Sequence, residues 1–286
     1  MKWNSESVAE NFLFFAAFLT ISVTIFIFVF MFILGLPLIK EGLFKLILEG
    51  WNPYSGKFGI LPMIMASVAI SFLALFISFP LSLACASLIT MGSGSFFCLF
   101  MRRFVQVMTG IPTVVYSFVA LFLLVPVIRE FFQSGSGLCI LSASIMLSIL
   151  IAPTMILIFV SGFNSVPKSY IQAIDAMGGG PVHRLFYVII PCSKNAVIIG
   201  AMLGFGRAMG DTLIPLMLAG NAVHIPGFVL DSARTLTAHI ALVSASDFDS
   251  LEFRSIFASG LVLYILIAGI VAVIQGKVRT REGFTT

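Results

Sequence analysis

The chain has 286 residues, of which 59% are hydrophobic and only 10% are charged, and its formal net charge is +4. Its mean hydropathy is +1.12. A soluble globular domain has about a quarter of its residues charged, so this chain could not cover a core with polar surface in water. These values indicate an integral membrane protein whose solvent is the lipid bilayer. The positive charge is therefore no sign of a nucleic-acid partner.

Six apolar stretches are long enough to cross the bilayer, because about 20 apolar residues span the hydrocarbon as a helix. They predict an all-α polytopic membrane protein with one transmembrane domain over 1–286 and no separate soluble domain. The predicted spans are 11–33, 61–89, 104–128, 138–163, 196–218 and 256–275. Prolines inside several spans predict kinks without a role, or breaks of the kind that accompany a transport path.

The distribution of basic residues indicates the orientation. The short loop "MRRF" (101–104) and the tail "GKVRTREG" (276–283) are basic, whereas the loop 221–255 carries four acids. Basic loops face the cytoplasm. We therefore expect both termini and the loop 164–195 in the cytoplasm, and the loops 35–60 and 221–255 outside.

Neither the cysteines nor the histidines have a spacing typical of a metal site or a disulfide framework. The cysteines share no C-x-x-C spacing and are Cys85, Cys98, Cys139 and Cys192. The histidines, all in predicted loops and without an H-E-x-x-H pattern, are His183, His224 and His239. We expect no bound metal, and we interpret the thiols as small apolar groups in or near the membrane.

The stretch "GFGRAMGDT" places Arg207 and Asp211 in the fifth predicted span. A charge in mid-membrane costs about 2.5–3.5 kcal/mol on insertion scales, and it marks a candidate functional residue. Residues four apart share one face of a helix, so the two side chains can pair. Two interpretations are open: a neutralised pair that locks two helices together, or a path in which Arg207 binds an oxyanion and Asp211 orients it.

Two glycine pairs in the same span have the spacing that allows close helix packing. They are Gly200 with Gly204, and Gly206 with Gly210. Small residues four apart let another helix approach closely. These pairs support the first of the two interpretations.

A membrane enzyme is one alternative class. An intramembrane aspartyl protease needs two membrane aspartates that share a proton, but the predicted spans contain Asp211 alone, and Ala208 replaces a glycine of the G-x-G-D signature. No predicted span has a histidine for serine chemistry. The chain lacks G-x-x-x-x-G-K-[ST], so it is not itself an ATPase. We expect no enzymatic activity and no cofactor; a carrier or channel that works without ATP is the other alternative.

The loop 164–195 predicts two short helices. The first covers about 168–177 and ends at Gly178–Gly180, because glycine accepts the left-handed conformation found past a helix C-terminus. Pro181 favours the start of the second helix. Taken alone, this element suits either a docking helix for a partner or an amphipathic linker.

The same loop resembles the EAA loop of importer-type ABC transporter permeases, whose pattern is Glu-Ala-Ala, three residues, Gly, nine residues, Ile-x-Leu-Pro. The aligned positions are Gln172, Ala173, Ile174, Gly178, Val188, Ile190 and Pro191. Ala173, Gly178 and Pro191 match, whereas Gln172 replaces the family's Glu. The resemblance implies that the helix around Tyr170 docks in an ATPase subunit, with Asp175 as a nearby acid.

Three further segments resemble the permeases of phosphate ABC importers, of the PstC type rather than PstA. They are "WNPYSGKFGILPMI" (51–64), "TGIPTVVYSFVALF" (109–122) and "GFGRAMGDTLIPLMLAGNA" (204–222). The resemblance implies a type I ABC importer permease fold with about six transmembrane helices. It places Arg207 on the path, as in the family's "GRAxGE", with Asp211 in place of the Glu.

The resemblance also implies the partners of the chain. They are a second permease subunit, two ATP-binding subunits that bind the ATP, and an extracytoplasmic phosphate-binding protein that docks on the outer loops. The alternatives are a permease for another oxyanion (molybdate, tungstate or sulfate) and a PstA-type partner subunit. Under each of them the chain itself performs no chemistry.

Overall fold

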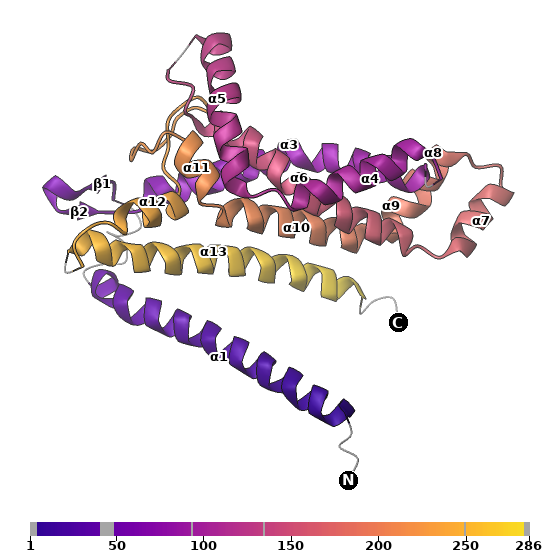
Figure 1. Ribbon diagram of the computed structural model, residues 1–286, viewed down its shortest axis with the longest axis horizontal. Coiled ribbons are helices and arrows are strands. Elements are labelled where there is room, and N and C mark those ends of the chain that lie inside the picture. The colour runs from indigo at the N-terminus through magenta and orange to yellow at the C-terminus, as the bar shows by residue number, and fades with distance from the viewer. Residues whose placement is uncertain (1–4, 41–48, 93, 134, 249, 283–286) are drawn as a thin grey trace.

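The computed structural model describes residues 5–40, 49–92, 94–133, 135–248 and 250–282. The prediction for the two termini therefore includes residues 1–4 and 283–286, which lie outside the described residues. The first turn of α1 and the last turns of α13 both lie toward the end of the molecule that carries α7 (Figure 1).

Long apolar segments form helices in a bilayer because the hydrocarbon offers no partner for a free backbone N–H or C=O group. The described residues contain five helices that are long and apolar enough to cross a membrane. These are α1 (Ser5–Lys40), α3 (Leu61–Met91), α5 (Thr113–Phe132), α6 (Ile140–Asn164) and α13 (Leu251–Glu282). A bent pair, Pro181–Cys192 with Lys194–Gly210 at 71°, makes a sixth span if it is counted as one.

Shorter elements connect these helices (Figure 1). At the end opposite α7 they are β1 (Trp51–Asn52), η1 (Pro53–Ser55), β2 (Lys57–Phe58), α11 (Leu213–Leu218) and α12 (Leu236–Val243). Along the bundle and toward its other end they are α4 (Phe96–Thr109), α7 (Lys168–Ala176), α8 (Pro181–His183), the π-helix η2 (Arg184–Ile189), α9 (Ile190–Cys192) and α10 (Lys194–Gly210).

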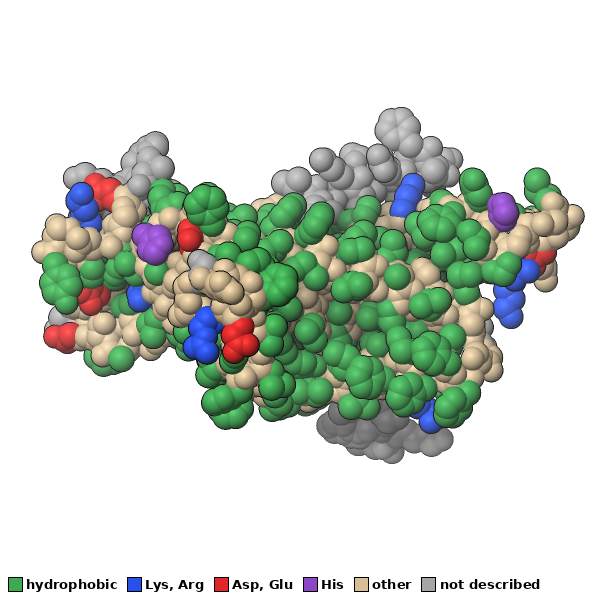
Figure 2. Space-filling model, turned by 90° about the horizontal axis from the view of Figure 1, so that it is seen from above, with side chains coloured by type: hydrophobic (Ala, Val, Ile, Leu, Met, Phe, Trp, Pro, Cys, Tyr) green, Lys and Arg blue, Asp and Glu red, His purple; other side chains and the backbone are tan. Residues whose placement is uncertain are grey.

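The surface agrees with a protein that lies in a membrane. On the face shown in Figure 2, apolar side chains form a broad band, and the charged side chains lie mainly toward the two ends. Helix α1 is apolar and exposed as well, since none of its most apolar window is buried within the chain. Such a surface is favourable against lipid and unfavourable in water.

The core is built around α6, of whose spanning window 67% is buried. Helices α3 and α10 pack against α6. The fully buried side chains at this interface include Ile151, Met155 and Phe159. A β-carbon at Gly200 would lie 2.5 Å from Cε1 of Phe159, so only glycine permits this approach of α10 to α6.

The two predicted glycine pairs have different environments. Gly204, like Gly200, faces α6, and a β-carbon there would lie 2.7 Å from Sδ of Met155. Beside Gly206 and Gly210 the described chain has no atom within 4 Å of such a β-carbon. The first pair packs helices within this chain, and the second borders open space.

The predicted third span is divided in the structure. Helix α4 ends at Thr109 and α5 begins at Thr113, so the range 104–128 is not one helix. Pro112 lacks an N–H group, and its ring would clash with a carbonyl of the preceding turn. Helix α5 projects away from the bundle (Figure 1). Arg102 and Arg103, predicted in a loop, lie within α4.

The end opposite α7 contains structure where long loops were predicted. The hairpin β1–β2 packs Trp51 against His239 of α12, with ring centroids 4.4 Å apart. His239 is fully buried, and its Nε2 lies 3.2 Å from Oγ of Ser255. The prediction that all histidines lie in loops is wrong for His239 and for His183 in α8. Burial, together with the charge of Arg234, lowers the pKa of His239 to about 3, so this ring is neutral at physiological pH.

Candidate functional site

Arg207 lies in the last turn of α10 and is half-buried. Its Nη1 donates a hydrogen bond of 2.7 Å to Oγ1 of Thr154 on α6. Thr154 follows Pro153, the proline inside α6. A guanidinium group has five N–H donors, and a threonine hydroxyl carries no charge. The contact therefore positions Arg207 without neutralising it.

Asp211 lies just beyond α10, in an extended conformation (φ −71°, ψ 135°). Its Oδ2 accepts a hydrogen bond of 2.9 Å from the backbone N–H of Ile214, in the first turn of α11. Its carbonyl oxygen accepts a hydrogen bond of 2.8 Å from Oγ1 of Thr237 on α12. A side-chain oxygen at this position satisfies an N–H group that has no partner within the helix. Asp211 thus stabilises the break between α10 and α11.

The predicted pairing of Arg207 with Asp211 is wrong in this structure. The described part of the chain has one ion pair, which joins Arg184 to Asp175. Residues four apart share a face only if the helix continues through both, and α10 ends at Gly210. The predicted span 196–218 is therefore two helices, α10 and α11, with Asp211 in the break.

Other elements complete the surroundings of Arg207. Tyr116 of α5 and Asp211 both lie close enough to interact electrostatically with its charge. The Tyr116 hydroxyl donates a hydrogen bond of 3.1 Å to the carbonyl of Met108. A β-carbon at the neighbouring Gly206 would meet open space. Among the described residues Arg207 donates one hydrogen bond, so its other N–H groups can bind an anion with several oxygen atoms.

The loop between α6 and α10 forms a second candidate site. Helix α7 carries four of the residues singled out in the sequence, and all four side chains are exposed: Tyr170, Gln172, Ala173 and Asp175. Gly178 follows with φ +80°, the left-handed conformation that ends the helix as its sequence predicts. Pro191 lies in α9, beyond the π-helix.

Asp175, which the resemblance gives as an acid near the ATPase contact, also forms an ion pair within its own loop. The Nε of Arg184 donates a hydrogen bond to Oδ1 of Asp175, which links α7 to η2 across the glycine turn. Asp175 is thus already paired within its own loop.

Sequence reasoning missed the apolar side chains that this loop exposes. Met177 is 86% exposed, Val182 61% and Tyr187 73%. The Tyr187 ring stacks on His183, with centroids 6.0 Å apart. Exposed apolar groups that lie together mark a surface for contact with a protein or a membrane. The signal in the sequence was the presence of such residues on both sides of the glycine turn.

Three features are typical of a polytopic membrane transport protein: a bundle of spanning helices, a helix that breaks at Asp211, and an exposed helical loop at one end. Residues 78–281 match the model of the family described as "binding-protein-dependent transport system inner membrane component". The chain belongs to this family. Its members are transporter permease subunits and not enzymes, so the chain is a multi-pass inner-membrane permease of the ABC importer type.

Several relatives of the chain are named as permeases. The "Probable ABC transporter permease protein YqgH" of Bacillus subtilis is 33% identical over 76% of this chain and 71% of its own length. The phosphate transport system permease protein PstC of Pasteurella multocida is 25% identical over 78% of this chain and 75% of its own length. The probable PstC of Methanocaldococcus jannaschii is 26% identical over 86% of this chain and 85% of its own length. These matches confirm the resemblance to PstC-type permeases.

Solved structures support the fold. An inward-facing structure of the MetNI methionine ABC transporter has a chain that superposes with a TM-score of 0.61 at 15% identity, covering 77% of this chain and 95% of that one. A second form of the same transporter gives a TM-score of 0.59 at 18% identity. The predicted type I ABC importer permease fold is thus confirmed, and at this identity the likeness concerns the fold alone.

Proposed function

We propose that this chain is the PstC-type permease of an ATP-driven importer of inorganic phosphate. A second permease would complete the path, two ATP-binding subunits would bind the ATP, and an extracytoplasmic phosphate-binding protein would deliver the substrate. The end with α7 and both termini would face the cytoplasm. Relatives named as phosphate transport permeases support the choice of substrate.

The observation that carries the proposal is the contact between Arg207 and Thr154. An arginine paired with a carboxylate would have little charge left for a substrate, whereas Arg207 is held by a neutral hydroxyl. A guanidinium group can bind two phosphate oxygens at once and stays charged throughout the cycle. The break at Asp211 agrees with this role, since broken helices commonly form transport sites near the bilayer midplane.

The second site supports coupling to ATPase subunits. Helix α7 is linked to η2 by the pair of Asp175 and Arg184, and the chain continues from η2 through α9 into α10, which carries Arg207. A partner that moves α7 would therefore move the helix of the candidate path. Tyr170, Gln172 and Ala173 present the exposed face for that partner.

Labelled phosphate uptake tests the proposal in cells that depend on this system. We expect uptake to require ATP and to resist an excess of unlabelled sulfate and molybdate. Arg207→Gln should abolish uptake at matched membrane levels. Arg103→Gln, the same charge change on α4, should leave it unchanged. Equal uptake in wild type and Arg207→Gln would make Arg207 a structural residue, and competition by sulfate, molybdate or tungstate would identify another oxyanion as the substrate.

A further inference from the structure

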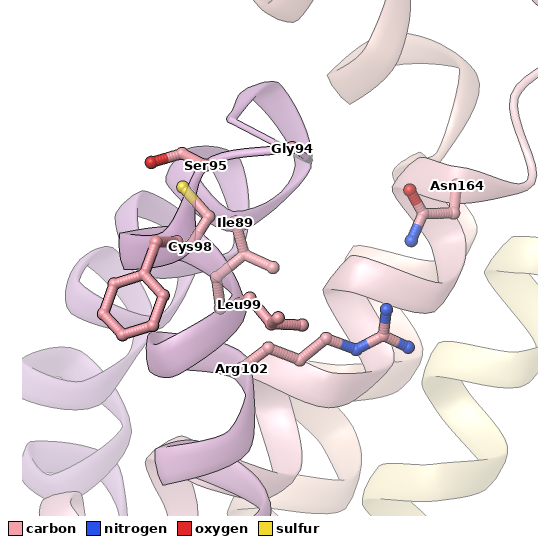
Figure 3. Close-up of a pocket in the computed structure, with 8 residues that line it drawn as sticks. Ile89, Gly94, Ser95, Cys98, Leu99, Arg102 and Asn164 are labelled. Carbon is pink, nitrogen blue, oxygen red and sulfur yellow. The ribbon is translucent and has the colours of Figure 1, made fainter.

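A cavity of about 360 Å³ lies between α3, α4 and the end of α6, at the end of the molecule that carries α7 (Figure 3). Ile89 and Leu99 form part of its apolar wall, and Ser95, Arg102 and Asn164 supply polar groups. The guanidinium of Arg102 reaches across the gap toward the Asn164 side chain (Figure 3). Small-molecule sites have volumes of roughly 300–1,000 Å³, so the cavity can hold a small polar group.

The charge of Arg102 has no counterpart on the surrounding helices. The sequences of α3, α4 and α6 contain no Asp or Glu. On α7, Asp175 is occupied by Arg184. A cation at the edge of a membrane bundle is costly unless an anion or water compensates it. Arg102 is exposed, so water can compensate its charge, and any compensating anion must come from outside these helices.

The polar groups of the cavity are donors that match a phosphate group. Arg102 offers a guanidinium fork, and Asn164 offers an amide at the exposed end of α6. Ser95 precedes the first turn of α4, and its hydroxyl points away from Arg102 (Figure 3). A guanidinium group with an amide N–H donor beside it is the chemistry that binds phosphate oxygens.

The face of α4 opposite Arg102 indicates which kind of molecule carries the bound phosphate group. Phe97, Phe100 and Phe104 are spaced by three and four residues, on the side of the helix away from Arg102, and are 60%, 56% and 52% exposed. Aromatic side chains on one face and an arginine on the other are typical of a helix at the boundary between acyl chains and headgroups. We propose that this cavity binds the phosphate group of an anionic phospholipid in the leaflet on the α7 side.

The position of the cavity gives such a lipid a consequence for coupling. Asn164 is the last residue of α6, and α7 begins at Lys168. A headgroup bound by both Arg102 and Asn164 connects α4 to the start of the loop that carries α7. Bound anionic lipid therefore limits the movement of this loop, whichever substrate is transported.

Native mass spectrometry of the purified, delipidated transporter complex tests the site. The complex is incubated with phosphatidylglycerol, with phosphatidylcholine of the same acyl chains, or with inorganic phosphate. Wild type should retain phosphatidylglycerol in preference to phosphatidylcholine. Arg102→Gln should weaken this retention roughly tenfold, because a charged hydrogen-bond donor is lost. The control Arg103→Gln, whose side chain does not line the cavity, should bind as wild type does.

Equal retention of both lipids, or equal binding by the Arg102 and Arg103 variants, would overturn the proposal. Binding of inorganic phosphate that depends on Arg102, without a preference for phosphatidylglycerol, would overturn the lipid and identify free phosphate as the ligand. If the complex with Arg102→Gln does not assemble, Asn164→Asp serves as the test variant. Its carboxylate should repel phosphatidylglycerol, and undiminished retention of that lipid would overturn the proposal. No arm measures transport, so the result is independent of Arg207.

Discussion

At the scale of residues, the central finding is that Arg207 and Asp211, four residues apart in the sequence, bind different partners and not each other. Arg207 binds a neutral hydroxyl on α6, and Asp211 caps the following short helix. A buried ion pair would lower the cost of both charges but would also occupy the arginine. The observed arrangement leaves the cation available and gives the acid a structural role.

Thr154→Val removes the hydroxyl that positions Arg207 while keeping the shape of the side chain. We expect the KM for phosphate uptake to rise roughly tenfold at unchanged membrane levels, since a hydrogen bond to a charged group contributes about 1.5–3 kcal/mol. Thr154→Ser retains a hydroxyl and should restore uptake. An unchanged KM in Thr154→Val would show that this hydroxyl does not position Arg207 for the substrate.

The sequence identifies Arg207 as a candidate but not its partner. A charge in an apolar span is conspicuous in any composition scan. Thr154 lies 53 positions away, and the contact depends on how α6 and α10 are aligned along their length. One chain read alone has no signal for that alignment. The expected pairing with Asp211 failed because it assumed that one helix continues through both residues.

At the scale of elements, glycine and proline residues determine where helices end, and the predicted helix ends were right or wrong at these residues. Helix α7 begins at Lys168 and ends within one residue of its predicted end, because Gly178 provides a left-handed stop. The range 104–128 was predicted as one span, although Pro112 separates α4 from α5. Hydropathy averages over such a break, since both sides are apolar. Only tertiary packing shows that the chain turns there.

The ion pair between Asp175 of α7 and Arg184 of η2 leads to a prediction about how ATP hydrolysis is coupled to transport. Asp175→Arg or Arg184→Asp alone would place like charges beside each other and loosen α7. We expect each single variant to hydrolyse more ATP per phosphate imported, by roughly fivefold or more, because coupling energies of about 1–3 kcal/mol correspond to about 5–150-fold. The measurement is ATPase rate and uptake in the same proteoliposomes.

The exchange of both charges is the control for that experiment. The double variant Asp175→Arg with Arg184→Asp restores opposite charges across the glycine turn and should recover the wild-type ratio. A surface ion pair contributes little to stability, so all three variants should reach the membrane. Failure of the double variant to recover would mean that one of these residues contacts the ATPase directly.

At the scale of the whole molecule, the fold divides into a packed centre and a lipid-facing periphery. Helix α6 is enclosed by α3 and α10, whereas α1 packs against α13 through ring contacts such as Phe28 with Tyr264. The family match begins at residue 78 and therefore does not include α1. Composition predicted the membrane and the helical class. It could not predict which helix is central, because every span is apolar on most of its faces.

The two glycine pairs of α10 allow the packing of α10 against α6 to be tested with substitutions in a single helix. Gly200→Ala would force its β-carbon against the rigid ring of Phe159, and overpacking of this kind costs about 1–3 kcal/mol. Gly206→Ala meets open space and should stabilise the helix by about 0.5–1 kcal/mol. Thermal unfolding of the purified chain in one detergent should therefore show a lower Tm for the first variant and an equal or higher Tm for the second. A similar fall in both would mean that Gly206 is also packed against a neighbour and that this face of α10 is not open.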